Sequence, residues 1–78
     1  MEEGQLGDIS PPAWRLLRVA AGYTQREVER EIDDFVQAHI SMLEGGNRSL
    51  SAPRRRMLFN LYAEELTEVQ AQVLIEHF

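Results

Sequence analysis

The sequence predicts an all-α fold, a compact bundle of about five short helices with no strand, in one small domain of 78 residues. Three observations predict this fold. Apolar residues recur three or four positions apart in successive segments, which is the period of a helix with one buried face. Ser or Thr stands where these segments begin, and glycine or a pair of aspartates stands where several of them end. Proline lies in the first turn of two of them.

The first helix is expected from residue 11 to about residue 21. Residues 1–9 before it are acidic and contain glycine, and we expect them to form a flexible tail. Ser10 supplies a capping hydroxyl, and the two prolines that follow fit the first turn, where a missing N–H costs nothing. Gly22 supplies the left-handed residue that ends the helix. One face holds the apolar residues Trp14, Leu17 and Ala21.

Two helices and a tight turn follow, which together predict a helix-turn-helix. Thr24-Gln25-Arg26-Glu27 is a capping box, in which the first and last side chains satisfy each other's backbone donors. Asp33-Asp34 ends this second helix because aspartate favours turns over helix interiors. The third helix is expected at about residues 35–44, before a pair of glycines. We expect Val36, Ile40 and Leu43 on its buried side and Gln37, Ala38, Ser41 and Met42 opposite.

Two further helices complete the predicted domain, which spans residues 10–78. The fourth begins at Ser51 with a proline in its first turn, and Leu58, Leu61 and Tyr62 form its apolar stripe. A second capping box at residues 67–70 begins the last helix, residues 67–78. Its apolar residues exceed what a small core needs, so we expect it to serve dimerisation or a protein partner. These residues are Val69, Val73, Leu74 and Phe78.

Charge is unevenly distributed along the chain. The net charge is −5, and all eight basic residues are arginine. Residues 1–9 and 63–78 hold seven acids and no base, whereas residues 10–62 hold all eight arginines and six acids. The middle is therefore mildly basic, and the acidic whole-chain balance argues only weakly against a nucleic-acid partner. The absence of lysine fits GC-rich coding, which we favour, or a need for forked phosphate donors.

Several classes of protein do not fit this sequence. There is no cysteine, and His39 and His77 have no carboxylate at a metal-ligand spacing, so we expect no disulfide, metal or cofactor. No nucleophile–base set or phosphate-cradling loop is visible, so we expect no enzyme activity. No apolar run approaches the roughly 18 residues that span a bilayer, and the N-terminus lacks a signal-peptide core. We expect a cytoplasmic protein with no membrane partner.

Residues 14–48 resemble the lambda-repressor/Cro-type helix-turn-helix family of DNA-binding proteins. The family pattern reads roughly I-R-x-L-R-x-x-x-G-L-T-Q-x-x-L-A, then a turn, then I-S-x-I-E-x-G-x-R. This chain has W-R-x-L-R-x-x-x-G-Y-T-Q-x-x-V from residue 14, and I-S-x-L-E-x-G-x-R from residue 40. It departs from the pattern in two ways: the turn at Asp33-Asp34 holds one extra residue, and Glu29 replaces the family's alanine. Both departures imply a wider crossing of the two helices.

The resemblance implies roles for particular residues. Residues 35–44 would be the recognition helix in the major groove, with its first turn against base edges. The implied base-reading residues are Gln37, Ala38, Ser41 and Met42. The implied phosphate contacts are Thr24, Gln25, His39, Arg48, Arg54 and Arg55, which carry affinity without sequence information. Arg18 and Glu44 would form a structural ion pair between the first helix and the recognition helix.

Alternatives remain open for several of these residues. The outer side of the third helix could simply be a solvated face. For His39 a packed or solvated imidazole is favoured over a phosphate contact, and His77 fits a role in complementing its helix dipole. Of the three consecutive arginines at residues 54–56, only one or two can face the same way, because successive residues of a helix lie about 100° apart.

The sequence therefore predicts a sequence-specific double-stranded DNA-binding transcriptional regulator of the repressor type. We expect a homodimer that reads two half-sites about one helical turn apart, in a prokaryotic, phage or plasmid context. The alternative is a protein-interaction module, such as an antitoxin or anti-regulator. Such a module would use the same scaffold and bind its partner through the acidic C-terminal helix.

Overall fold

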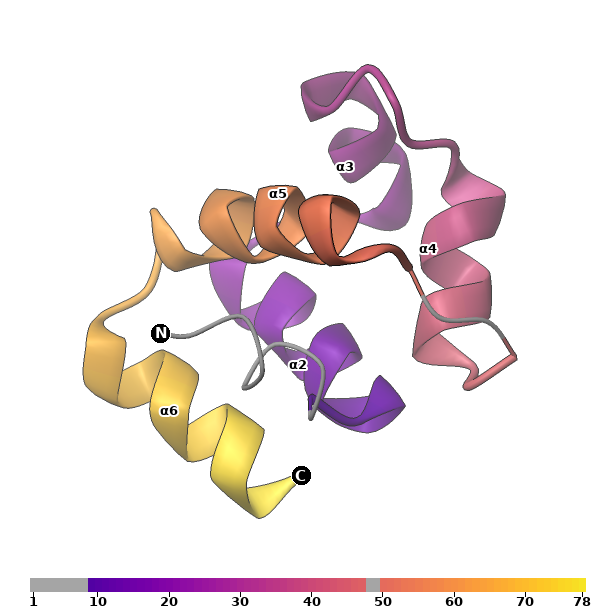
Figure 1. Ribbon diagram of the computed structural model, residues 1–78. Helices are drawn as coiled ribbons and strands as arrows, with labels where there is room; N and C mark the ends of the chain where they lie inside the picture. The colour runs from indigo at the N-terminus through magenta and orange to yellow at the C-terminus, as the bar shows by residue number, and fades with distance from the viewer. Residues whose placement is uncertain (1–8, 48–49) are drawn as a thin grey trace.

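The computed structural model describes residues 9–47 and 50–78. Within them the chain forms five helices and no strand, so the predicted all-α class is confirmed. The helices are α2 (Pro11–Ala21), α3 (Gln25–Glu31), α4 (Gln37–Glu44), α5 (Ala52–Ala63) and α6 (Glu68–His77). Figure 1 shows α2 in the middle, with α3 and α4 towards one end of the molecule, α6 at the other and α5 across it. α2 packs against α4, α5 and α6.

Local signals in the sequence set the ends of these helices. The Ser10 side chain caps α2, and Gly22 ends it with a left-handed φ of 89°. Both predicted capping boxes are formed, the first at α3 by Thr24 and Glu27. The second is formed at α6 by Thr67 and Gln70. Because each of these motifs needs residues only a few positions apart, the chain can adopt it before distant segments meet.

The helix predicted from about residue 35 begins two residues later, at Gln37. The Phe35 N–H donates to the Ile32 carbonyl at 3.1 Å, which closes a turn. Val36 follows with extended backbone (φ −115°, ψ 157°) as the N-cap residue. Phe35 is only 1% exposed, whereas Val36 is 48% exposed. The prediction that Val36 lies on the buried side of this helix is therefore wrong. Burial of the larger apolar side chain therefore decides where the turn ends and α4 starts.

The core is built from apolar residues of all five helices and of the segments between them. Trp14 and Tyr62 lie at its centre with an edge-to-face ring contact, centroids 6.4 Å apart. Ile9 also belongs to the core at 6% exposure, so it is not part of a flexible tail as predicted for residues 1–9. The other residues of that predicted tail, 1–8, lie outside the described part. None of the helices in the described ranges has the length and hydrophobicity that a membrane span needs.

Candidate nucleic-acid interface

α4 turns one face to the core and the other to solvent. Ile40 is fully buried and Leu43 is 6% exposed. Gln37, Ala38 and Ser41 are exposed, and Met42 is half-buried. At about 100° per residue, these four outward residues occupy a single side of the helix. The four residues expected to read bases therefore share one surface, with Met42 at its edge.

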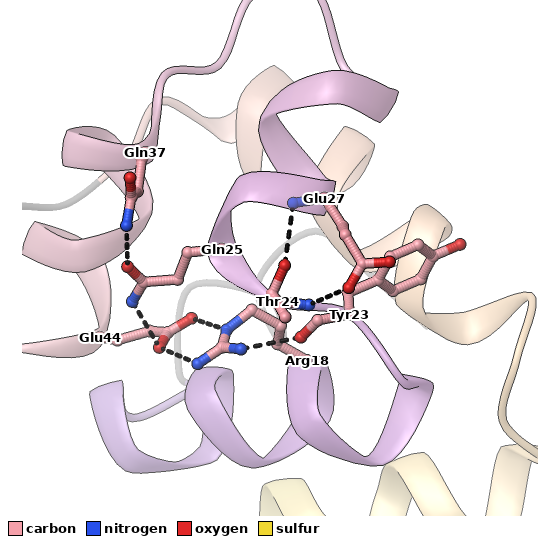
Figure 2. Close-up of polar contacts among 7 residues, drawn as sticks. All are labelled: Arg18, Tyr23, Thr24, Gln25, Glu27, Gln37 and Glu44. Carbon is pink, nitrogen blue, oxygen red and sulfur yellow. Dashed lines mark hydrogen bonds and ion pairs between the residues drawn. The ribbon is translucent and has the colours of Figure 1, made fainter.

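A chain of hydrogen bonds connects the first residue of α4 to its last, through the start of α3 (Figure 2). The Gln37 Nε2 atom donates to Gln25 Oε1 at 3.5 Å, the long limit for a hydrogen bond. The Gln25 Nε2 atom in turn donates to Glu44 Oε1 at 3.2 Å. Gln25 thus contacts both ends of α4, and the Gln37 amide has a partner that restricts its orientation.

The other end of this chain is a two-pronged ion pair between α2 and α4. Arg18 Nε donates to Glu44 Oε2 at 2.8 Å, and Arg18 Nη2 donates to Glu44 Oε1 at 3.0 Å. The Arg18 Nη1 atom donates to the Tyr23 carbonyl at 2.8 Å, so the guanidinium also holds the turn before α3. Only 11% of the Arg18 side chain and 5% of the Glu44 side chain are exposed. The hydrogen bonds to Glu44 raise the pKa of Arg18, which keeps the pair charged.

Thr24 is occupied by its capping role. Its Oγ1 atom accepts from the Glu27 N–H at 3.1 Å, and the Glu27 carboxylate accepts from the Thr24 N–H at 3.0 Å. These bonds lower the pKa of Glu27. A hydroxyl that accepts can still donate its own hydrogen. Thr24 can therefore cap α3 and donate to an anion beside the helix N-terminus at the same time.

Glu29 caps α4, a role that sequence reasoning missed. Its Oε2 atom accepts from the Gln37 N–H at 2.5 Å, and the N-cap residue Val36 makes no side-chain cap of its own. From the sequence alone, Glu29 stands out only because the lambda-repressor/Cro-type pattern has alanine at this position. A helix that begins after a valine needs an acceptor from elsewhere in the chain, and this need appears only once the helix is known to begin at Gln37. Arg26 and Arg30 border the same shallow groove as Glu29 and Gln37.

The other residues expected to contact phosphates differ in their burial and in their hydrogen bonds. Arg55 is half-buried, and its Nη1 atom donates to the Leu50 carbonyl at 2.5 Å, so it fixes the segment before α5. Arg54 is half-buried near the start of α5. His39 is half-buried on the flank of α4, and its Nδ1 atom has no hydrogen-bond partner within the described residues. Arg48 lies outside the described residues.

The outward face of α4 offers an amide, a methyl group, a hydroxyl and a thioether, which make hydrogen bonds and apolar contacts. In the described part of the chain, no three His, Cys, Asp or Glu side chains are grouped so that they could hold a metal ion.

Comparison with known proteins gives one family. Residues 3–55 match the family described as Domain of unknown function (DUF8599). The match covers more than half of the 78 residues, and the chain belongs to this family. The matched segment includes α2, α3, α4 and the start of α5, and it excludes α6. No curated protein and no solved structure was found to be similar to the chain.

Proposed function

We propose that this protein is a sequence-specific double-stranded DNA-binding regulator, similar to the lambda-repressor/Cro-type family, with α4 as its recognition helix. The observation that carries the proposal is the outward face of α4, where Gln37, Ala38 and Ser41 are exposed and Gln25 braces the first of them. The major groove of B-DNA is wide enough to admit such a helix. In helix-turn-helix proteins the first turn of the second helix meets the base edges.

Gln37 is well equipped for base reading. Its side-chain amide has two N–H donors and one oxygen acceptor. One N–H is directed at Gln25, which leaves the second N–H and the oxygen for the N7 and N6 groups of adenine. Ala38 is suited to a thymine methyl group, and Ser41 and Met42 reach the next base pair. The contact with Gln25 already restricts the Gln37 side chain in the free protein. Less conformational entropy is therefore lost on binding, which favours affinity.

Affinity in this proposal comes from phosphate contacts around α4. Thr24 and Gln25 lie at the N-terminus of α3, where backbone N–H groups and the helix dipole favour an anion. Arg54 and Arg55, near the start of α5, add positive charge, and Arg48 belongs to the same proposed set. The protein would act as a homodimeric repressor in a prokaryotic cytoplasm, with one copy on each half-site.

Selection of binding sites from random duplex DNA tests this function. The wild-type chain should enrich one motif, with affinity that falls steeply as salt rises. Gln37→Ala should lose preference at one base pair, at a cost of about 1–3 kcal/mol for the preferred base. Gln72→Ala is the matched control, because Gln72 is an exposed glutamine on α6. This control should enrich the wild-type motif unchanged.

Two outcomes would count against the proposal in different ways. If the wild-type chain enriches no motif even at low salt, it is not a sequence-specific DNA-binding protein. If Gln37→Ala enriches the same motif as the wild type, the protein reads DNA with other residues and the assignment of Gln37 is wrong.

A further inference from the structure

α2 and α6 enclose an apolar groove on the surface away from α4. Its volume is about 380 Å³, and its lining residues are Ala20, Leu66, Val69, Gln70, Val73 and Leu74. α2 lies between α4 and α6, and α6 forms the other side of the groove (Figure 1). A molecule in the groove would therefore leave the outward face of α4 uncovered.

The two valines that line this groove are largely exposed to solvent, unlike the apolar residues of the core. Val69 is 71% exposed and Val73 is 46% exposed, whereas Ala71 on the opposite side of α6 is buried at 4%. Contiguous exposed apolar side chains with a polar border mark a surface that binds another molecule.

The border of the groove on the α6 side is acidic. Glu68, Gln72 and Glu76 are four positions apart, so they form a polar edge directly beside the two valines of the same helix. All three are exposed. The sequence from residue 63 to residue 78 contains four acids and no lysine or arginine. A molecule that covers the two valines therefore places the residues at the edge of its own apolar surface next to these carboxylates.

A second copy of α6 is a poor match for this border. In a two-fold antiparallel pairing of helices, each edge meets the same edge of the other helix. Glu68 of one copy would then lie near Glu76 of the other, and the four carboxylates would repel one another. A helix with basic residues on its edge would instead place an opposite charge at both positions.

We propose that the groove between α2 and α6 binds an amphipathic helix of a partner protein, with an aliphatic stripe and a Lys/Arg edge. The stripe covers Val69 and Val73, in the way that an amphipathic helix occupies an apolar groove. The basic edge lies against Glu68 and Glu76. A partner helix can occupy this groove whether or not the chain binds DNA, because the two surfaces lie on different sides of α2.

The test uses the full chain and two synthetic fluorescent peptides of about 16 residues, long enough for an amphipathic helix. Both carry leucine at helical spacing, and one has lysine on its edges where the other has glutamate. Fluorescence anisotropy at low salt should show at least about fivefold tighter binding of the lysine peptide. The Val69→Ser/Val73→Ser variant should bind that peptide at least about tenfold more weakly, because it removes apolar surface from the contact.

Met57→Ser is the matched control, since Met57 is an exposed apolar residue (39%) on α5 rather than in the groove. It should bind the lysine peptide as the wild type does. Equal affinity for the two peptides would overturn the proposal, as would equal weakening by the valine and methionine variants. Sedimentation of the chain alone supplies a further check. A dimer that the Val69→Ser/Val73→Ser variant dissociates would show that the occupant is a second copy.

Discussion

Glu44 is the side chain on which the geometry of the candidate interface most depends. Three N–H groups converge on its carboxylate, two from Arg18 and one from Gln25. Through these bonds, a residue at the end of α4 sets the position of the glutamine that braces Gln37. Because Glu44 is shielded from water, its charge depends on these donors rather than on solvent.

Replacing Arg18 by methionine tests this dependence. Arg18→Met leaves the Glu44 charge shielded and without its main partner, so we expect the free energy of unfolding to fall by about 3 kcal/mol or more. The double variant Arg18→Met/Glu44→Leu removes both charges and should regain most of that loss. Urea unfolding of the two variants and the wild type measures both changes. A loss under about 1 kcal/mol in the single variant would mean that the pair behaves as a solvent-exposed one.

At the scale of the helix, α4 depends on its neighbour for its own start. Val36 has no side-chain acceptor for the first N–H groups of α4, and Glu29 of α3 supplies one. This hydrogen bond links α3 to the first turn of α4. It also places a negative charge at the end of α4 that would face DNA, where it opposes the phosphates.

Variants of Glu29 should separate these two effects. Glu29→Ala removes the acceptor and should lower the free energy of unfolding by about 1 kcal/mol, as the loss of a helix cap does. Glu29→Gln keeps an acceptor oxygen without the charge, so it should cost less stability and strengthen duplex binding at fixed salt. Glu31→Gln is the control, the same charge change on an exposed residue of α3. Equal gains in DNA affinity from both glutamine variants would show that the position of Glu29 is unimportant.

The two capping boxes of the chain differ in one respect. Glu27 closes the box of α3, and Gln70 closes the box of α6. The hydrogen bonds from Thr24 lower the pKa of Glu27, so the folded state holds the ionised form more firmly than the unfolded chain does. The resulting stability is present above the unfolded pKa of about 4.3 and is lost as the pH falls through the lower, folded pKa.

Exchange of the two capping residues gives a pH-dependent prediction. Glu27→Gln should lower stability slightly near pH 7, where the ionised carboxylate contributes, and should flatten its decline below about pH 4.3, since no proton is then taken up at this position. Gln70→Glu, the reverse exchange at α6, should steepen the same decline. Urea unfolding between pH 7 and pH 3 follows both variants. Three parallel pH profiles would contradict the assignment of this dependence to the capping box.

For the molecule as a whole, the features predicted from the sequence are those that depend on near neighbours. Ser10, Gly22 and the two capping boxes act within a few residues, and the helices they bound lie where they were predicted. The start of α4 was wrong by two residues because burial of Phe35, a contact with distant segments, decides it. Ile9 was assigned to the tail for the same reason, since nothing beside it in the sequence indicates that it is buried.

In the candidate interface, too, the features that depend on near neighbours were predictable and those that depend on distant segments were not. The outward side of α4 follows from helical period alone, because Ile40 and Leu43 mark its inner side. The contact of Arg18 with Glu44 joins residues 26 positions apart, and only the family resemblance indicated it. Glu29 could not be assigned, because its partner is a backbone N–H that becomes unsatisfied only when α4 begins at Gln37. Contacts of this kind require the tertiary fold.

One helix lies beneath both proposed binding surfaces. α2 presents Arg18 to Glu44 on one side and Ala20 to the apolar groove on the other. If a ligand on either side tilts this helix, the free energy of that tilt contributes both to DNA binding and to binding of the partner helix. Thermodynamic linkage then requires that a partner peptide changes DNA affinity by the same factor by which DNA changes peptide affinity. Through α2, the partner peptide and DNA would thus each act as an effector of the other's binding.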